Sequence, residues 1–470
     1  MAERLTTREI IGYGLGDTAA NLFLQMFNYY LMIYYTDVFG IPAAMAGLII
    51  IVTRAWDTAI DPVMGIISDR TRTRWGRFRP YMIWGAVPFG LAGILAFTNP
   101  HFSQTGNIIW AFATYSLLML MFTFINTPYN ALMSVLTSDI KQRLKISSFK
   151  FVFAYLGGII VTLFAKDMIQ SLGGTNEQAG YTNTAIIFGV AAILLTIVSF
   201  LSTRERVQPV PAQKSSVKED LKDLKNNSPW ILLLFINVFV VASISMRQGA
   251  SAYYFKYFVT QKELALSFFG KTYHPDFVSA FNATGHIAMM LGVILIGIFT
   301  KNIEKKRLYI IVMAIASLAT FPFFFLDPSS SVSMFVFQFL INLTCGSTGV
   351  LVWAMYADII DFSDWKNNRN ATGLIFSASI MTQKLGWTVG GAGVGLLLSY
   401  FGFKANAVQS STSMEGIILM MSILPGICTL AASILMYFYK LDNNFMTRIS
   451  QELNERRAQQ QLPEVENASV

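Results

Sequence analysis

The sequence predicts an all-α membrane protein with twelve transmembrane helices arranged in two six-helix bundles. Only 13% of the 470 residues are charged and 54% are hydrophobic, whereas a soluble domain carries about 25% charged residues. The hydrophobic residues gather in long blocks, and one helical crossing of a bilayer takes about 20 of them. The chain is therefore long enough for about a dozen crossings with short loops. This composition excludes a soluble globular domain and a disordered chain.

The hydrophobic blocks place the twelve helices, in chain order, near residues 9–36, 43–68, 80–99, 106–136, 147–168, 182–202, 229–258, 276–300, 307–327, 331–360, 371–402 and 412–440. The longest polar stretch follows the sixth helix and divides the chain. We expect four regions, which are an N-terminal bundle at 1–203, a cytoplasmic middle loop at 204–228, a C-terminal bundle at 229–441 and a cytoplasmic tail at 442–470.

Two short amphipathic helices are expected outside the bundles. In the middle loop, Ser216 and Glu219 have the spacing of a capping box. In the tail, Phe445, Ile449 and Leu453 recur at helical spacing. The tail pattern predicts a helix that covers the cytoplasmic end of the bundles.

The basic residues predict the orientation in the membrane. The chain carries 35 Lys and Arg against 27 Asp and Glu, a net charge of +8. Most of the basic residues lie at the termini and in the even-numbered loops, and cytoplasmic loops of membrane proteins collect Lys and Arg. We therefore expect both termini in the cytoplasm, and we attribute the charge to topology rather than to a nucleic-acid partner. The odd-numbered loops hold only Lys166, Lys256, Lys262, Lys271 and Lys404.

Charged residues inside membrane segments mark candidate functional sites, because each costs about 2.5–3.5 kcal/mol at the bilayer centre. The helix near 43–68 carries Arg54, Asp57 and Asp61, whose spacing places them on one helical face. Two carboxylates with one arginine leave a net negative charge, which suits a Na⁺ ion or a proton. A structural ion pair between Arg54 and one aspartate is the alternative, but it leaves the other aspartate unpaired.

Two other helices carry stripes of polar residues. The stripe on the helix near 9–36 consists of Asp17, Asn21, Gln25 and Asn28. The stripe on the helix near 106–136 consists of Thr123, Asn126 and Asn130, beside Pro128. Amide and carboxylate groups suit sugar hydroxyls, since they donate or accept hydrogen bonds in fixed geometry. For the stripe near 9–36 the alternative is hydrogen bonding between helices. For the stripe near 106–136 it is a kink at Pro128 whose freed backbone groups are satisfied by nearby polar groups.

Three further cationic residues belong to predicted helices. Lys150 opens the helix near 147–168, Arg247 precedes Gln248 in the helix near 229–258, and Lys384 lies inside the helix near 371–402. Lys384 has no carboxylate near it in the sequence, so its partner must come from another helix. Asp57 or Asp61 is the natural choice.

The layout of six plus six helices resembles the major facilitator superfamily, and the loop GIISDR at 65–70 is similar to that superfamily's signature loop. Within it, the chain resembles the glycoside–pentoside–hexuronide:cation symporters over nearly its whole length. The motifs that carry this resemblance are IGYGLGD, YLMIYYTDVFG, RAWDTAIDPVMG, RTRWGRFRPYM, NTPYNAL, SISMRQGASAYYFKYF and YADIIDFSDWK. Such proteins rock two halves of the fold around a site near the bilayer midplane.

The resemblance implies roles for single residues. The implied cation-binding residues, which would be metal ligands if the cation is Na⁺, are Asp57, Asp61 and Thr123. The expected sugar-binding residues are Asn21, Gln25, Asn126, Asn130 and Lys150. The residues expected to couple the two sites are Lys384 and Arg54. The residues expected to gate the cytoplasmic side through ion pairs are Asp69, Arg70 and Arg77.

Several matched positions depart from the family pattern. Ile60 stands where the family has an asparagine, and the lost oxygen makes proton coupling more plausible than Na⁺ coupling. Asn21 and Asn126 replace aspartates, Asn130 replaces a tryptophan and Lys150 replaces an arginine. These changes disfavour melibiose as the substrate. An acidic glycoside, to which Lys150 and Arg247 would supply positive charge, and a neutral pentoside or β-glycoside both remain open.

The sequence thus predicts a symporter that imports a glycoside, pentoside or hexuronide across the bacterial inner membrane. We expect a monomer with no cofactor other than the coupling cation, H⁺ or Na⁺. A transporter of a lysolipid or an organic anion and an uncoupled sugar facilitator are the rival functions. An enzyme is disfavoured because no set of nucleophile, base and orienting residue appears.

Overall fold

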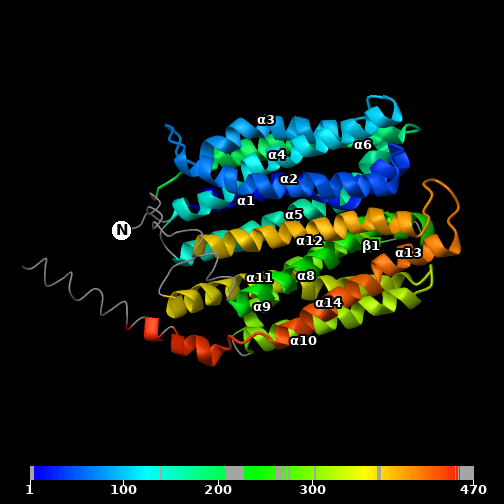
Figure 1. Ribbon diagram of the computed structural model, residues 1–470. Coiled ribbons are helices and arrows are strands. Elements are labelled where there is room, and N and C mark those ends of the chain that lie inside the picture. The colour runs from blue at the N-terminus through cyan, green and yellow to red at the C-terminus, as the bar shows by residue number, and fades with distance from the viewer. Residues whose placement is uncertain are drawn as a thin grey trace, which may run out of the picture.

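The computed structural model shows two groups of roughly parallel helices (Figure 1). It describes residues 5–137, 140–206, 227–260, 266–268, 271–273, 276–300, 303–367, 372–449, 451–453 and 455. The expected helix with Ser216 and Glu219 lies outside the described residues, and so does the side chain of Asp69.

The first half of the chain forms one group of helices, coloured blue to cyan in Figure 1. Its elements are α1 (Thr7–Met26), η1 (Phe27–Leu31), η2 (Tyr34–Val38), α2 (Ala43–Arg70), α3 (Arg79–Ala96), α4 (Gln104–Leu136), α5 (Ile140–Gly173) and α6 (Glu177–Ser202). The π-helical turns η1 and η2 continue α1, so the segment expected near 9–36 is helical throughout. A capping box of Thr6 and Glu9 begins α1.

The second half forms the other group, coloured green to red. Its elements are α8 (Ser228–Tyr253), η3 (Tyr254–Phe258), β1 (Leu266–Phe268), β2 (Lys271–Tyr273), α9 (Phe277–Phe299), α10 (Lys305–Thr320), η4 (Phe321–Phe325), α11 (Ser331–Asn367), α12 (Thr372–Tyr400), α13 (Ser411–Met421) and α14 (Ile423–Tyr437). The strands β1 and β2 pair as a short antiparallel hairpin between η3 and α9. This hairpin is a small departure from the expected all-α fold.

Hydropathy supports the membrane assignment. Within the described residues, nine helices are long and apolar enough to cross a membrane. Many large apolar side chains on them are exposed, for example Leu194 and Leu318, as expected where lipid covers the surface. The total of twelve crossings stays a prediction.

Among the described elements, the two halves pack most extensively between α2 and α12, between α5 and α9, and between α8 and η1. Glycines allow the closest approach. A Cβ atom on Gly395 of α12 would lie 2.6 Å from the Ala43 carbonyl oxygen of α2, and one on Gly390 would lie 2.5 Å from the Ala242 carbonyl oxygen of α8. The glycine-rich stretch of α12 thus lets its backbone pack against helices of both halves.

The segment expected as one helix at 412–440 is broken at Ser422, which has φ −126° and ψ −87°. The physical reason is Pro425, which has no N–H to donate to the carbonyl of Met421 four residues earlier. The break leaves the Met421 carbonyl free for another donor.

The tail begins as expected with a helical segment, at residues 443–449. Ile449 and Leu453 are buried, and the Phe445 ring packs edge-on against Trp365 of α11 at 5.9 Å between centroids. The Trp365 indole also donates to Glu452 at 2.6 Å. This segment and the start of α1 lie at the same end of the molecule (Figure 1).

Candidate functional site

Two carboxylates, a hydroxyl and an ammonium from three helices meet at the contact between the halves. Asp57 and Asp61 come from α2, Thr123 from α4 and Lys384 from α12. The Lys384 Nζ lies 2.9 Å from Asp57 Oδ2 and 2.6 Å from Asp61 Oδ2. Lys384 therefore contacts both of the aspartates that the sequence analysis proposed as its partners. We call Asp57, Asp61, Thr123 and Lys384 the carboxylate cluster.

Each carboxylate of the cluster turns one oxygen to Lys384 and the other to Thr123. The Thr123 hydroxyl lies 2.5 Å from Asp57 Oδ1 and 3.4 Å from Asp61 Oδ1. The Thr127 hydroxyl lies 3.4 Å from the same Asp61 oxygen. The Lys384 ammonium thus occupies the point where the two carboxylates converge.

The members of the cluster differ in exposure. The Asp57 side chain is 0% exposed and the Lys384 side chain 12%, whereas the Asp61 side chain is 22% exposed. Asp61 is therefore the more accessible of the two carboxylates.

Arg54 lies apart from the cluster's ion pairs. Within the described part of the chain it pairs with neither Asp57 nor Asp61, so the alternative of a structural Arg54–aspartate pair is wrong there. Arg54 is buried, and its guanidinium lies beside the Tyr115 hydroxyl of α4. The cation that pairs with the two aspartates is therefore Lys384, and not Arg54 as the helical spacing suggested.

The expected sugar-binding residues of α4 and α5 form a second polar cluster. Lys150 Nζ donates to Asn130 Oδ1, and the Asn130 amide donates to Asn126 Oδ1. Asn126 lines a pocket of about 330 Å³ together with residues of α1, α3 and α6. The structure therefore connects Lys150, Asn130 and Asn126 in one chain of hydrogen bonds.

The stripe on α1 is hydrogen-bonded along its own helix. The Asn21 amide donates to the Asp17 carbonyl at 2.9 Å, and the Gln25 amide donates to Asn21 Oδ1 at 3.3 Å. The buried Asp17 carboxylate accepts from the Tyr129 hydroxyl at 2.7 Å. Asp17 therefore connects α1 with α4.

The expected gating residues lie at the end of α2 and in the loop after it. Arg70 is exposed and makes no ion pair with another described residue. The backbone N–H of Arg77 donates to Glu205 at 2.9 Å, and the N–H groups of Phe78 and Arg79 donate to the same carboxylate. Sequence reasoning missed Glu205, because its partners are backbone groups.

Two ion pairs join the halves at the end opposite to Arg70, and the sequence did not identify either. Lys256 of η3 pairs with Asp37 of η2, which also accepts from the Tyr257 hydroxyl at 2.5 Å. Lys166 of α5 lies 2.5 Å from Asp276 at the start of α9. We call these two pairs the closing pairs. Asp37, Lys256 and Asp276 lie at helix ends, where charge is ordinary, and Lys166 lies inside α5.

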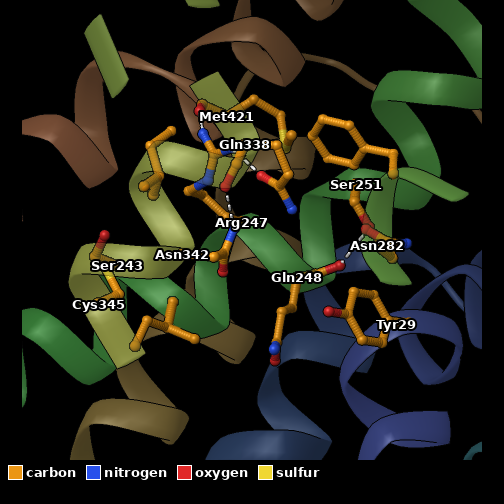
Figure 2. A pocket seen from close by; sticks show the side chains of 13 residues that line it. Tyr29, Ser243, Arg247, Gln248, Ser251, Asn282, Gln338, Asn342, Cys345 and Met421 are labelled. Atoms are coloured by element: carbon orange, nitrogen blue, oxygen red, sulfur yellow. Dashed lines mark hydrogen bonds between the residues drawn. The ribbon is translucent and has the colours of Figure 1, made fainter. Parts of the chain in front are cut away.

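A second pocket, of about 380 Å³, lies mainly in the second half of the chain (Figure 2). Arg247 and Gln248 of α8 line it, as does Tyr29 from the first half. The amides that sequence reasoning missed are Asn282, Gln338 and Asn342. Single amides in apolar helices give a weak signal, although Gln338 and Asn342 share one face of α11. We call this cavity the arginine pocket.

The chain is similar to known transporters over nearly its whole length. A family model described as MFS/sugar transport protein matches residues 12–443. The chain is 34% identical to the inner membrane symporter YicJ of Escherichia coli (strain K12), over 99% of this chain and 100% of that protein. It is also 34% identical to the putative glycoside/cation symporter YagG of the same strain, over 97% of each chain.

Among solved structures, a D-xylose-proton symporter superposes with a TM-score of 0.64 at 12% identity, over 92% of this chain and 97% of that one. At this identity the likeness concerns the fold. It matches the expected arrangement of two helical bundles.

Proposed function

Because the chain belongs to the MFS/sugar transport protein family, we propose that it is a cation-coupled symporter that imports a glycoside, pentoside or hexuronide. The resemblance to glycoside:cation symporters agrees with the names of its relatives. We place the protein in the bacterial inner membrane as a multi-pass protein with both termini in the cytoplasm. Its activity is transport by alternating access, and no catalytic step is part of the proposal.

The carboxylate cluster is the observation that carries this proposal. Two carboxylates share one lysine from the opposite half, at 2.9 and 2.6 Å. A coupling cation would take the place of the Lys384 ammonium between Asp57 and Asp61, with the Thr123 hydroxyl as a further oxygen ligand. The neighbouring Ile60 side chain offers no oxygen, which favours H⁺ over Na⁺ as the cation.

This exchange links cation binding to movement of the halves. Lys384 belongs to α12 and its partners to α2, so the ion pairs also hold the two halves together. A cation that neutralises the carboxylates releases Lys384 and weakens that contact. We propose that this release is how the cation biases the carrier between its two orientations.

The sugar would bind beside this cluster. Asn126, Asn130 and Lys150 form a connected row of donors and acceptors, and Asn21 and Gln25 of α1 add two more amides. Amides and an ammonium suit sugar hydroxyls. Arg54 and Lys384 would transmit the charge state of the cluster.

The two ends of the molecule would gate access. The closing pairs join the halves at one end, while at the other end Arg70 is exposed. We propose that ion pairs involving Asp69, Arg70 and Arg77 form when the carrier turns its opening to the other side of the membrane.

Uptake into proteoliposomes tests the proposal. Labelled neutral and acidic methyl glycosides are offered under an imposed H⁺ gradient and, separately, an imposed Na⁺ gradient. We expect one gradient to drive accumulation of a sugar. Asp57→Asn should not accumulate the sugar, and Asp327→Asn, a change at an exposed aspartate, should accumulate it as the wild-type protein does.

Other results would favour the rival functions. Sugar that equilibrates without accumulating under either gradient would indicate an uncoupled facilitator. Uptake of a lysolipid or an organic anion, without uptake of any sugar, would overturn the proposal.

A further inference from the structure

Arg247 is a buried cation that has no acidic partner among the described residues. Its side chain belongs to α8 and the residue is 7% exposed. None of the ion pairs between described residues includes it, whereas Lys166, Lys256, Lys305 and Lys384 each contact a carboxylate. Burying an ion without its counter-charge is strongly unfavourable, so this arginine requires a physical explanation.

Among the described residues, the hydrogen-bond and ring partners of Arg247 are neutral groups. One guanidinium nitrogen donates to Gln338 Oε1 at 2.8 Å, and another donates to the Met421 carbonyl that Pro425 leaves free. The Phe323 ring lies 4.6 Å from the guanidinium carbon. These two hydrogen bonds use two of the five N–H donors of an arginine.

The arrangement orients Arg247 without neutralising it. A carbonyl, an amide and an aromatic ring fix the plane of the guanidinium, and each carries only a partial charge. Because an arginine keeps its proton in proteins, it remains cationic in the empty carrier. A bound ligand can therefore supply the negative charge that compensates the Arg247 guanidinium.

The arginine pocket has the lining that such a ligand needs. Figure 2 shows the Arg247 guanidinium beside Gln338 and Met421, with Tyr29 across the pocket from them. Gln248 is 8% exposed, and its side-chain oxygen accepts no hydrogen bond from the part of the chain that the structure describes. This buried acceptor is available to a hydroxyl donor in the cavity.

The remaining side chains of the arginine pocket favour a sugar. Asn282 and Asn342 add amide donors and acceptors, which match the hydroxyls of a pyranose ring.

We propose that the arginine pocket binds the anionic group of the transported substrate, and that this substrate is an acidic sugar whose carboxylate pairs with Arg247. The inference rests on the proposed transport function and narrows its substrate class to uronides. It assigns recognition of the anion to the C-terminal half, away from the residues matched to the family's sugar site.

The competing explanation is a structural role, in which Arg247 only stabilises the break between α13 and α14. Arg79 offers a matched control, because it also donates to two carbonyls, of Trp75 and Phe200, and lies 4.6 Å from a phenyl ring, that of Phe200. Arg79 belongs to α3 and does not line the arginine pocket. Replacing it removes a similar set of contacts elsewhere.

The test compares methyl β-D-glucuronide with methyl β-D-glucoside, which differ only in the carboxylate at C6. Binding of each is measured by isothermal calorimetry on the purified full chain, without any gradient. We expect the wild-type protein to prefer the glucuronide at least about tenfold, as for a charged hydrogen bond. Arg247→Gln should remove this preference, and Arg79→Gln should retain it.

Each alternative outcome is informative. A wild-type protein that binds the glucoside equally or better overturns the inference even if Arg247→Gln does not fold, and it leaves the proposed function intact. A preference that survives in folded Arg247→Gln also overturns it. Chloride or phosphate that competes with the glucuronide at equal potency would identify the ligand as an inorganic ion instead. Failure of both sugars to bind would count against the proposed function as well.

Discussion

Two of the buried charged centres in the described part of the chain handle charge in opposite ways. The carboxylate cluster carries two negative groups, and a lysine of the other half lies 2.9 and 2.6 Å from them. Arg247 is similarly buried, but its partners are an amide, a carbonyl and a ring. One centre is thus compensated within the protein, and the other is not.

This difference shows how a carrier can use buried charge. A compensated centre can bind a cation only by releasing its own lysine, so binding there is coupled to a change in structure. An uncompensated centre can bind an anion with no internal exchange. Charge inside a membrane is unfavourable. In a symporter, the cation would compensate the carboxylate cluster and the anionic substrate would compensate Arg247.

The largest expected effect is that of Asp57→Asn. Asp57 is fully buried and contacts both Lys384 and Thr123, so its neutralisation removes one of two carboxylates from the cation site. We expect cation-driven accumulation to fall to the level of liposomes without protein. Sugar exchange across the membrane should persist, and accumulation that survives the substitution would place the cation elsewhere.

The second prediction removes the internal counter-charge. Lys384→Met leaves the buried Asp57 and the partly exposed Asp61 without their counter-charge, and breaking a buried pair costs about 3–5 kcal/mol. The melting temperature should fall and should become strongly dependent on pH or Na⁺, because an external cation now stabilises the cluster. A melting temperature unchanged in every buffer would mean that the ion pairs contribute little.

A smaller effect is expected at Thr123, whose hydroxyl lies 2.5 Å from Asp57. Thr123→Val keeps the shape but leaves a buried carboxylate oxygen without its donor, a loss of about 1–3 kcal/mol. Thr123→Ser should retain function as the matched control. The concentration of cation that gives half-maximal uptake should rise in the valine variant alone.

The smallest expected effect concerns the closing pairs. Lys256→Ala removes an interaction of a side chain that is 35% exposed, for which about 1 kcal/mol is the upper end of the usual range. We expect a cysteine placed at Ala252 to react several-fold faster with a membrane-impermeant maleimide in this variant. An unchanged rate, with Lys166→Ala also unchanged, would show that the closing pairs do not hold that end shut.

The sequence was sufficient for the helical fold and for the carboxylate cluster. Long apolar blocks define membrane helices, and the cost of intramembrane charge singles out Asp57, Asp61 and Lys384 as partners. The arginine pocket was predicted only in part. Arg247 and Gln248 stand out in α8, but Asn282 and Gln338 are single amides whose convergence depends on how α9 and α11 pack.

Other contacts depend on three-dimensional packing that the hydrophobic periodicity of the sequence does not specify. The break at Ser422 exposes the Met421 carbonyl to Arg247, although the sequence pattern of 412–440 fits a single helix. The pair of Asp37 and Lys256 joins two helix ends that are far apart in the chain. Both depend on the arrangement of the bundles rather than on local sequence.

The central claim is that sugar and cation move together because Asp57 and Asp61 bind the cation. Linkage is reciprocal, so a sugar gradient alone must move the cation. The decisive measurement is internal pH or internal Na⁺ in proteoliposomes after external sugar is added without any cation gradient. We expect sugar-driven cation entry in the wild-type protein and none in Asp57→Asn. Sugar entry with no movement of either cation would contradict the claim and make the carboxylate cluster a purely structural ion pair.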